Sequence, residues 1–348
     1  MSERGYRILY AHRLLNELKS FALTALLTVV VGALLLIALG YGPVEFVSKL
    51  LEGTWGKERN RVEVMIIATP LVLIALGYCV SFRVSWNIGG EGQYVMGAVA
   101  ASAVALKLAS IVPSSILVLL ILLVGAIIGG TWVGIAAIIK VRFDRNEAFV
   151  TLMLNLVALS FAEWVYSYPL RDSRSGFPRT PRFADEAKLP IILHDTRLHL
   201  GVVITLLLVV MGYVLLARTT WGFRIRMVGA NINAARYAGL RVKWIIFYSM
   251  AIAGGLAGLA GAIQAVSVTG RLADGVSSGY GNLAIVIAWL ANKNPLLIIP
   301  VAVLLATLIS GTRFLQISLG VSDYLGQLIA YMVMFTVVVV GNEIENRP

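Results

Sequence analysis

Long apolar segments follow one another along this chain and constrain its fold more than any other feature. A helix needs about 20 apolar residues to cross the hydrocarbon core of a bilayer. About ten segments meet or approach this requirement, at 21–42, 63–82, 88–109, 114–139, 147–167, 198–217, 244–268, 282–292, 295–313 and 324–341. The sequence therefore predicts an all-α integral membrane protein with about ten transmembrane helices.

The composition excludes the main alternatives. Of the 348 residues, 59% are hydrophobic and 14% are charged, whereas soluble domains have about 45–50% apolar and about 25% charged residues. No long stretch has a soluble composition. A soluble enzyme, a disordered chain and a protein with a large soluble catalytic half are thereby excluded.

The first apolar segment is predicted to be a retained span. It follows a basic stretch and ends at Gly40-Tyr41-Gly42-Pro43 without the small-residue pattern of a signal-peptide cleavage site. An even number of spans places both termini on one side of the membrane. We therefore expect a cytoplasmic segment at 1–20, a transmembrane domain at 21–341 and a cytoplasmic tail at 342–348.

The net charge of +11 indicates orientation rather than nucleic-acid binding. More than half of the 29 Lys and Arg residues are cytoplasmic if the N-terminus is inside. This orientation makes 168–197 an extracytoplasmic loop and 218–243 a basic cytoplasmic loop. Four prolines block regular structure in the 168–197 loop, which is either a solvated connector or a surface where a partner docks.

The sequence offers no group for catalysis or metal binding. Its one cysteine, Cys79, lies in an apolar run, and its three histidines share no apolar segment. It contains no phosphate-binding G-x-x-x-x-G-K-[ST] loop, no GxSxG and no HExxH. We predict a chain that is not an enzyme and has no ATPase motif of its own.

Two polar, glycine-rich passages interrupt the apolar pattern, and we call them the first interruption (82–93) and the second interruption (274–282). Non-helical chain at membrane depth occurs only against protein or a watery cavity. Interrupted segments in the two halves of a chain are typical of a binding site between internal repeats. The alternative is a cytoplasmic turn whose glycines allow close helix packing.

Several polar or aromatic residues in and near these passages are candidates for lining a substrate path. Asn155, in an apolar run, either faces this path or joins helices. The candidate residues are Phe82, Trp86, Asn87, Gly89, Glu91, Gln93, Asn155, Tyr280 and Asn282.

The basic loop at 218–243 predicts a helix of about two turns. Asn231 or Asn233 suits the N-cap, Ala234 and Ala235 favour helix, and Gly239 suits a left-handed position after the last turn. Such a short helix needs a partner surface or the membrane face for stability. Further along, Gly254, Gly258 and Ala262 repeat at every fourth position, a pattern that predicts close helix packing.

Three passages resemble the motifs of one family. FRVSWNIGGEGQYVMGAVAA, VGANINAARYAGLRV and SGYGNLAIVIAWLANKNP occur in the order seen in permease subunits of bacterial ABC importers of the branched-chain amino acid and ribose type. They are similar in particular to nucleoside and simple-sugar permeases. The resemblance extends over about residues 20–341.

This resemblance implies the architecture of a type II ABC importer permease in a bacterial cytoplasmic (inner) membrane. It implies a second permease subunit (a paralogue or a second copy), a cytoplasmic ATP-binding cassette protein and an extracytoplasmic substrate-binding lipoprotein. ATP and Mg²⁺ would be held by the ATPase, and this chain would bind no cofactor.

The resemblance also assigns residues. The family's ATPase-coupling loop corresponds to Gly229, Asn231, Ala234, Ala235, Arg236 and Gly239, and its glycine-rich motif to Asn87, Gly89, Glu91, Gly92 and Gln93. Ser85-Trp86 and Trp289-Leu290-Ala291-Asn292 depart from the usual motifs.

The implied substrate is a nucleoside, followed by a pentose or a related sugar. The rival reading is a self-sufficient secondary transporter or channel in which the Glu91 carboxylate couples transport to protons.

Overall fold

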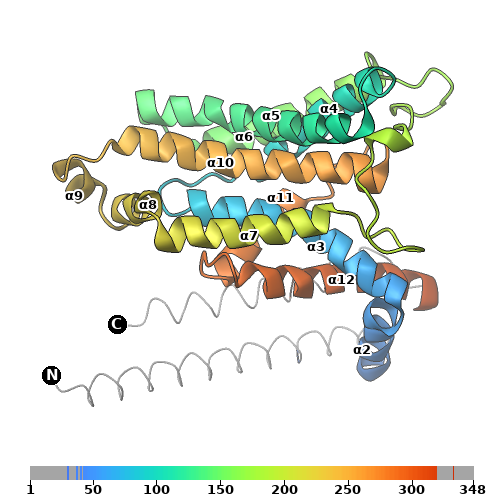
Figure 1. Ribbon diagram of the computed structural model, residues 1–348. Helices are drawn as coiled ribbons and strands as arrows, with labels where there is room; N and C mark the ends of the chain where they lie inside the picture. Colours follow the sequence, from blue (N-terminus) through green and yellow to red (C-terminus); the bar gives the residue numbers. More distant parts are fainter. Residues whose placement is uncertain (1–29, 31–36, 38–39, 41, 320–331, 333–348) are drawn as a thin grey trace. The chain divides into compact units, whose positions relative to one another are not determined.

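A computed structural model describes residues 42–319 and, in addition, residues 30, 37, 40 and 332. This part of the chain contains eleven α-helices, α2 to α12, and only isolated β-bridges (Figure 1). The predicted spans at 21–42 and 324–341 lie almost entirely outside the described residues. The described residues divide into two compact units, one containing those up to Val64 and from Leu304 onward, the other containing Met65–Val303.

The first unit contains a helix that the hydropathy pattern did not predict. Helix α2 (Pro43–Leu51) is too short to span a membrane and continues into a π-helical turn at Glu52–Gly56. Pro43 stands at its start, where the missing N–H costs nothing. Phe46 and Leu50 form a small core with Leu315 near the end of α12 (Ile298–Leu319).

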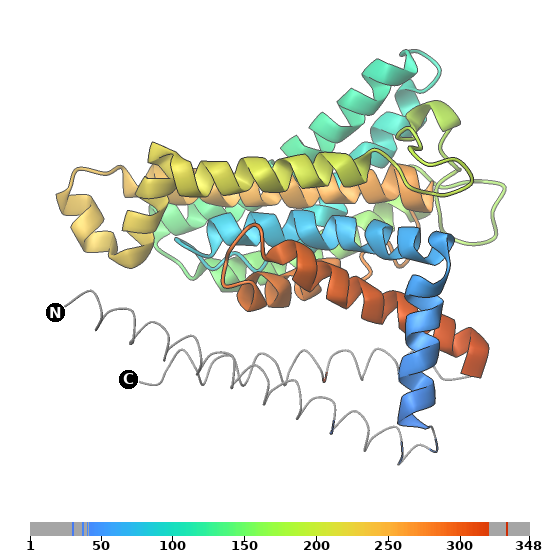
Figure 2. The same cartoon turned by 60° about the horizontal axis from the view of Figure 1, so that its bottom comes forward.

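The second unit contains most of the helices. They are α3 (Glu58–Ser81, which begins in the first unit), α4 (Gly90–Leu108), α5 (Ser114–Phe143), α6 (Glu147–Ser167), α7 (Gly201–Arg218), α8 (Thr220–Ala230), α9 (Ile232–Tyr237), α10 (Val242–Ile263), α11 (Tyr280–Leu290) and the start of α12. Both views place α8 and α9 together at one end of this unit, beyond the ends of α7 and α10 (Figures 1 and 2).

Six helical segments among the described residues are long and apolar enough to cross a membrane. They are Glu58–Ser81, Ser114–Phe143, Glu147–Ser167, Gly201–Arg218, Val242–Thr269 and Ile298–Ser318. Each coincides with a predicted segment. The segment predicted at 88–109 forms α4, which is not among these six, and α11 is short, as expected. The all-helical, membrane-spanning character of the chain is thereby confirmed.

The helices differ sharply in burial. The most apolar 18-residue stretch of α3 is 94% buried, whereas the corresponding stretches of α5, α6 and α7 are each 28% buried. A helix that is apolar all round lies either in the interior of a bundle or in a membrane. The exposed apolar faces of α5, α6 and α7 suit lipid or another membrane chain.

Small residues bring α4, α5 and α10 into backbone contact. A methyl group at Gly258 of α10 would overlap the carbonyl oxygen of Gly125 in α5, and one at Gly261 would overlap that of Tyr94 in α4. The packing role predicted for Gly258 and its neighbours is confirmed.

The loop at 168–197 is more than a solvated connector. Phe183, Ala187 and Leu189 are buried. The Thr180 N–H donates to the Leu272 carbonyl over 2.9 Å, and the Leu272 N–H donates to Thr180 Oγ1, also over 2.9 Å. The loop is therefore packed against the segment that precedes α11.

Candidate functional site

Side chains of α6 hold the first interruption in place. Residues 82–89 are not helical, so their backbone groups need partners within the bundle. Glu147, Thr151 and Asn155 lie one helical turn apart on α6 and therefore share one face. All three are buried and accept hydrogen bonds from the interruption.

These bonds occur in chain order. The Trp86 N–H donates to Glu147 Oε1 over 3.0 Å, and the Ile88 N–H donates to Thr151 Oγ1 over 3.2 Å. Asn155 Oδ1 accepts the Gly92 N–H over 2.8 Å, and Asn155 Nδ2 donates to the Ile88 carbonyl over 3.2 Å. Asn155 thus joins α6 to the first interruption, which is one of its two predicted roles. That it also lines a substrate path stays a prediction.

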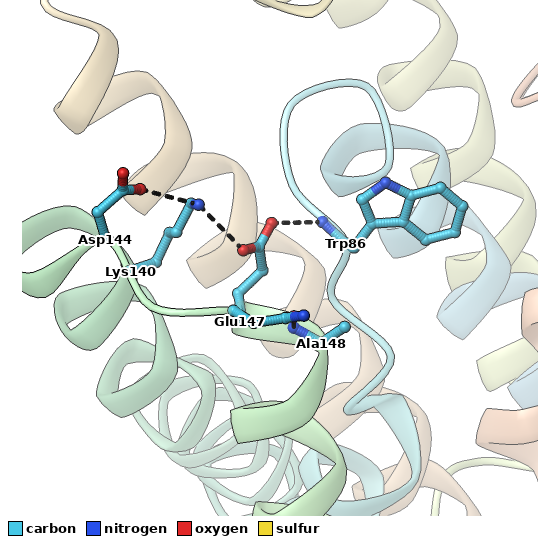
Figure 3. Close-up of a pocket in the computed structure, with 6 residues that line it drawn as sticks. Trp86, Lys140, Asp144, Glu147 and Ala148 are labelled. Atoms are coloured by element: carbon cyan, nitrogen blue, oxygen red, sulfur yellow. Dashed lines mark hydrogen bonds and ion pairs between the residues drawn. The ribbon is translucent and has the colours of Figure 1, made fainter.

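Glu147 also ends a row of charged groups beside Trp86. Lys140 Nζ lies 3.3 Å from Glu147 Oε2 and 3.0 Å from Asp144 Oδ1. The hydrogen bond and the attraction from Lys140 lower the pKa of the Asp144 carboxyl below its usual value. An open cavity of about 460 Å³ is lined by these residues (Figure 3) together with Asn146 and Ala148.

Asn87 and Gln93 bind each other. Gln93 Nε2 donates to Asn87 Oδ1 over 2.8 Å, and the same oxygen accepts the Gly89 N–H over 3.1 Å. Both side chains are buried. The two amides therefore close the turn that leads into α4.

Glu91 joins the two interruptions. It lies in the first turn of α4 and is 3% exposed. Its Oε1 accepts a hydrogen bond from the Ser277 hydroxyl, and its Oε2 accepts the Gly281 N–H over 2.6 Å. Since Gly281 lies in the first turn of α11, the carboxylate meets the positive end of that helix dipole.

Tyr78 of α3 completes this junction. Its hydroxyl accepts the Gly90 N–H over 2.9 Å and donates to the Gly281 carbonyl over 3.2 Å. The pattern of the sequence did not single out Tyr78, because one tyrosine in an apolar helix is an ordinary core residue. The remaining candidates of the second interruption differ in burial: Tyr280 is buried with its ring edge-on to Tyr94, whereas Asn282 is exposed.

A row of aromatic rings connects α3, the first interruption and α11. Tyr78 stacks on Phe82 with ring centroids 4.6 Å apart, and Phe82 lies 5.7 Å from Trp86. Trp86 lies 5.5 Å from Trp289, over which Lys293 Nζ is placed at 5.2 Å. We call Trp86 and Trp289 the indole pair; both belong to the stretches that depart from the usual motifs, and Trp289 was missing from the predicted path residues.

The predicted coupling loop forms two helices rather than one. Asn231 caps α9 as predicted, with its Oδ1 accepting the N–H groups of Asn233 and Ala234 over 3.0 Å each. Gly239 has the predicted left-handed backbone, with a φ of 77°. Helix α8 before it was not predicted.

The surface of this pair of helices is largely exposed. Asn231, Ala234, Arg236 and Gly239 are exposed, whereas Ala235 is buried. Tyr237, which no pattern in the sequence singles out, is 95% exposed.

Within the part of the chain that the structure describes, no group of three or more His, Cys, Asp or Glu residues could hold a metal ion. Cys79 is buried.

The profile of a family described as the permease component of branched-chain amino acid transport systems matches residues 60–338. The guanosine ABC transporter permease protein NupP of Bacillus subtilis is 33% identical over 312 residues, which cover 87% of this chain and 88% of the relative. The glucose ABC transporter permease protein TsgB13 of Haloferax volcanii is 29% identical over 323 residues, covering 90% and 84%.

A third relative, the nucleoside ABC transporter permease protein NupB of Lactococcus lactis, is 27% identical over 290 residues, covering 80% of this chain and 79% of the relative. No solved structure gives a significant match.

Proposed function

The chain belongs to the family of permease components of branched-chain amino acid transport systems, and we propose that it forms the path by which a nucleoside enters the cell. It is a multi-pass membrane subunit of an ABC importer and is not itself the ATPase. Such a permease works with a partner ATPase and a substrate-binding protein.

The observation that carries the substrate assignment is the indole pair. Trp86 comes from the first interruption and Trp289 from the helix after the second, and the Trp86 side chain is 53% exposed. Stacking a nucleobase on an aromatic side chain contributes about 1–3 kcal/mol. The names of NupP and NupB, guanosine and nucleoside permeases, support the same substrate class, whereas TsgB13, a glucose permease, makes a sugar the competitor to test.

We expect Trp86→Ala to reduce nucleoside uptake. Loss of roughly 1.4 kcal/mol of stacking corresponds to about a tenfold decrease in kcat/KM. Uptake of labelled guanosine, with ribose and glucose as competitors, is measured in proteoliposomes that also contain the partner permease, the ATPase and the binding protein. Trp86→Phe should retain most of the uptake.

The matched control is Trp164→Ala, because Trp164 of α6 is 52% exposed and lies outside both interruptions. Equal uptake by Trp86→Ala and Trp164→Ala would contradict the role of Trp86. Competition by glucose or ribose, but not by nucleosides, would assign the transporter to sugars.

The α8–α9 pair is the surface on which we place the ATPase. It projects at one end of the second unit, and its exposed residues combine a cation, Arg236, with an apolar ring, Tyr237. Aromatic residues and arginine are enriched in protein interfaces. In this arrangement α8 and α9 lie in the cytoplasm together with both termini, as the distribution of basic residues favours.

Closure of the ATPase would move α8 and α9 as a lever and open the path between the interruptions. ATP and Mg²⁺ would stay on the ATPase. The exposed apolar faces of α5, α6 and α7 would be covered by lipid and by a second permease, either a paralogue or a second copy.

Arg236→Glu is expected to uncouple ATP hydrolysis from transport. Reversal of the charge at the proposed interface should reduce uptake to less than a tenth, while the chain still inserts and purifies as a monodisperse protein. The measurement is uptake and ATP hydrolysis in the same vesicles. Arg142→Glu, which changes an exposed arginine at the end of α5, is the control, and wild-type uptake by Arg236→Glu would refute the placement of the ATPase.

A further inference from the structure

We propose that Arg83 is the positioning residue that transmits movement of the α8–α9 pair to the indole pair. The inference rests on the proposed function, in which the ATPase moves α8 and α9. It adds the route by which that movement reaches the two interruptions.

The Arg83 side chain connects two helix ends. Its Nε donates to the Cys79 carbonyl at the end of α3 over 3.1 Å. Its Nη2 donates over 2.8 Å to the carbonyl of Lys293, which lies 210 positions further along the chain. The last carbonyls of a helix have no partner within it, so one half-buried guanidinium satisfies the end of α3 and holds the turn after α11.

That turn has an unusual backbone. Asn292 and Lys293 both have left-handed conformations, with φ of 47° and 56°. Residues other than glycine adopt this conformation at a cost and keep it when the surroundings enforce it. The bond from Arg83 is one of the contacts that fix this turn.

The Arg83 backbone is in contact with α8. Gly229, at the end of α8, lies so close to the Arg83 carbonyl oxygen that a methyl group added to it would overlap that oxygen. No side chain lies between the two segments at this point. Movement of the end of α8 toward the bundle therefore pushes directly on the backbone of Arg83.

Both indoles lie within four residues of an end of the Arg83–Lys293 hydrogen bond. Trp86 follows Arg83 by three residues, and Trp289 precedes Lys293 by four. The Lys293 ammonium lies over the Trp289 ring, and the Trp86 backbone is tied to Glu147 of α6. A displacement of Arg83 changes the position of the Lys293 turn relative to an anchored Trp86 and thereby separates the two rings.

Arginine suits this position better than lysine. A planar guanidinium offers donors in fixed and different directions, so it reaches two carbonyls at once, whereas an ammonium on a flexible chain acts as a single point charge. The relay therefore depends on the shape of the side chain as well as on its charge.

The test measures nucleoside molecules moved per ATP hydrolysed by the complete transporter in proteoliposomes. We expect Arg83→Ala to retain the ATPase subunit on purification and to hydrolyse ATP within about twofold of wild type, while transport per ATP falls at least tenfold. Arg83→Lys should show a smaller loss. The variant Arg142→Ala, at the end of α5, should behave as wild type.

A fluorescence readout separates a relay from a merely structural role. ATP should change the tryptophan fluorescence of the transporter, and the part of this change that disappears in the double variant Trp86→Phe/Trp289→Phe comes from the indole pair. The same part should also disappear in Arg83→Ala. Wild-type transport per ATP, or an unchanged ATP-dependent signal, in Arg83→Ala would overturn the proposal. A wild-type chain that shows no ATP-driven uptake would instead refute the proposed function.

A second variant keeps the test independent of the folding of Arg83→Ala. Gly229→Ala leaves Arg83 intact but places a methyl group against its carbonyl, so it should reduce transport per ATP by a similar factor. Gly134→Ala on α5 is its control, because an added methyl group there meets nothing within 4 Å. Wild-type coupling in Gly229→Ala would show that the contact does not carry the movement.

Discussion

Gly258→Ala is expected to destabilise the bundle strongly, although alanine is the better helix former. Exchange of glycine for alanine inside a helix contributes about 1 kcal/mol of stability when the site is open. At Gly258 the new methyl group would meet the Gly125 carbonyl oxygen and would lie 2.8 Å from the Gly129 Cα. Because both obstacles are backbone atoms of α5, the helices have to separate, and overpacking of this kind costs about 1–3 kcal/mol or more.

The neighbouring glycine provides the control. A methyl group at Gly255, on the same helix, would lie 3.4 Å from the Ala126 carbonyl oxygen, which is ordinary contact. Thermal unfolding in detergent, followed by size-exclusion chromatography, should therefore give a lower melting temperature for Gly258→Ala and an unchanged or higher one for Gly255→Ala. Equal melting temperatures would show that the close contact between α10 and α5 does not limit the stability of the bundle.

The long helices were predictable because the apolar residues of each helix follow one another in the sequence. A run of about 20 apolar residues has few alternatives to a spanning helix, and the segments at 114–139 and 147–167 match α5 and α6 closely. Helices α2 and α8 were missed because they are short, and short helices depend on what they pack against. Helix α9 was predicted because Asn231 and Gly239 mark its two ends locally.

The contacts of the site were less predictable because they join distant parts of the chain. Asn146 and Glu147 have the ordinary appearance of a helix start, a cap followed by an acidic first turn. Nothing in that pattern indicates that Glu147 also accepts the Trp86 N–H. Both interruptions were visible as polar, glycine-rich passages, but their meeting at Glu91 depends on how α3, α4 and α11 pack.

Glu91→Ala is expected to have the largest effect on transport among substitutions at the junction. Hydrogen bonds to a charged group contribute about 1.5–3 kcal/mol, and removal of the acceptor leaves buried donors without a partner. The Gly281 N–H and the Ser277 hydroxyl would lose their acceptor, and the start of α11 would lose its anion. We therefore expect uptake to fall by more than tenfold and the melting temperature to fall as well.

The pairing with Ser277 allows the junction to be tested directly. If Glu91 acts by binding the second interruption, Ser277→Ala should cost less than Glu91→Ala, and the double variant should cost less than the sum, because one interaction is removed twice. Glu163→Ala, which removes an exposed carboxylate from α6, should leave uptake unchanged. If the effects of Glu91→Ala and Ser277→Ala on uptake were additive, the two residues would not act through a shared interaction between the two interruptions. The rival hypothesis, a self-sufficient transporter, predicts uptake driven by a pH gradient without the ATPase. Loss of that uptake in Glu91→Gln would identify Glu91 as a proton carrier, because glutamine retains an acceptor oxygen but does not titrate.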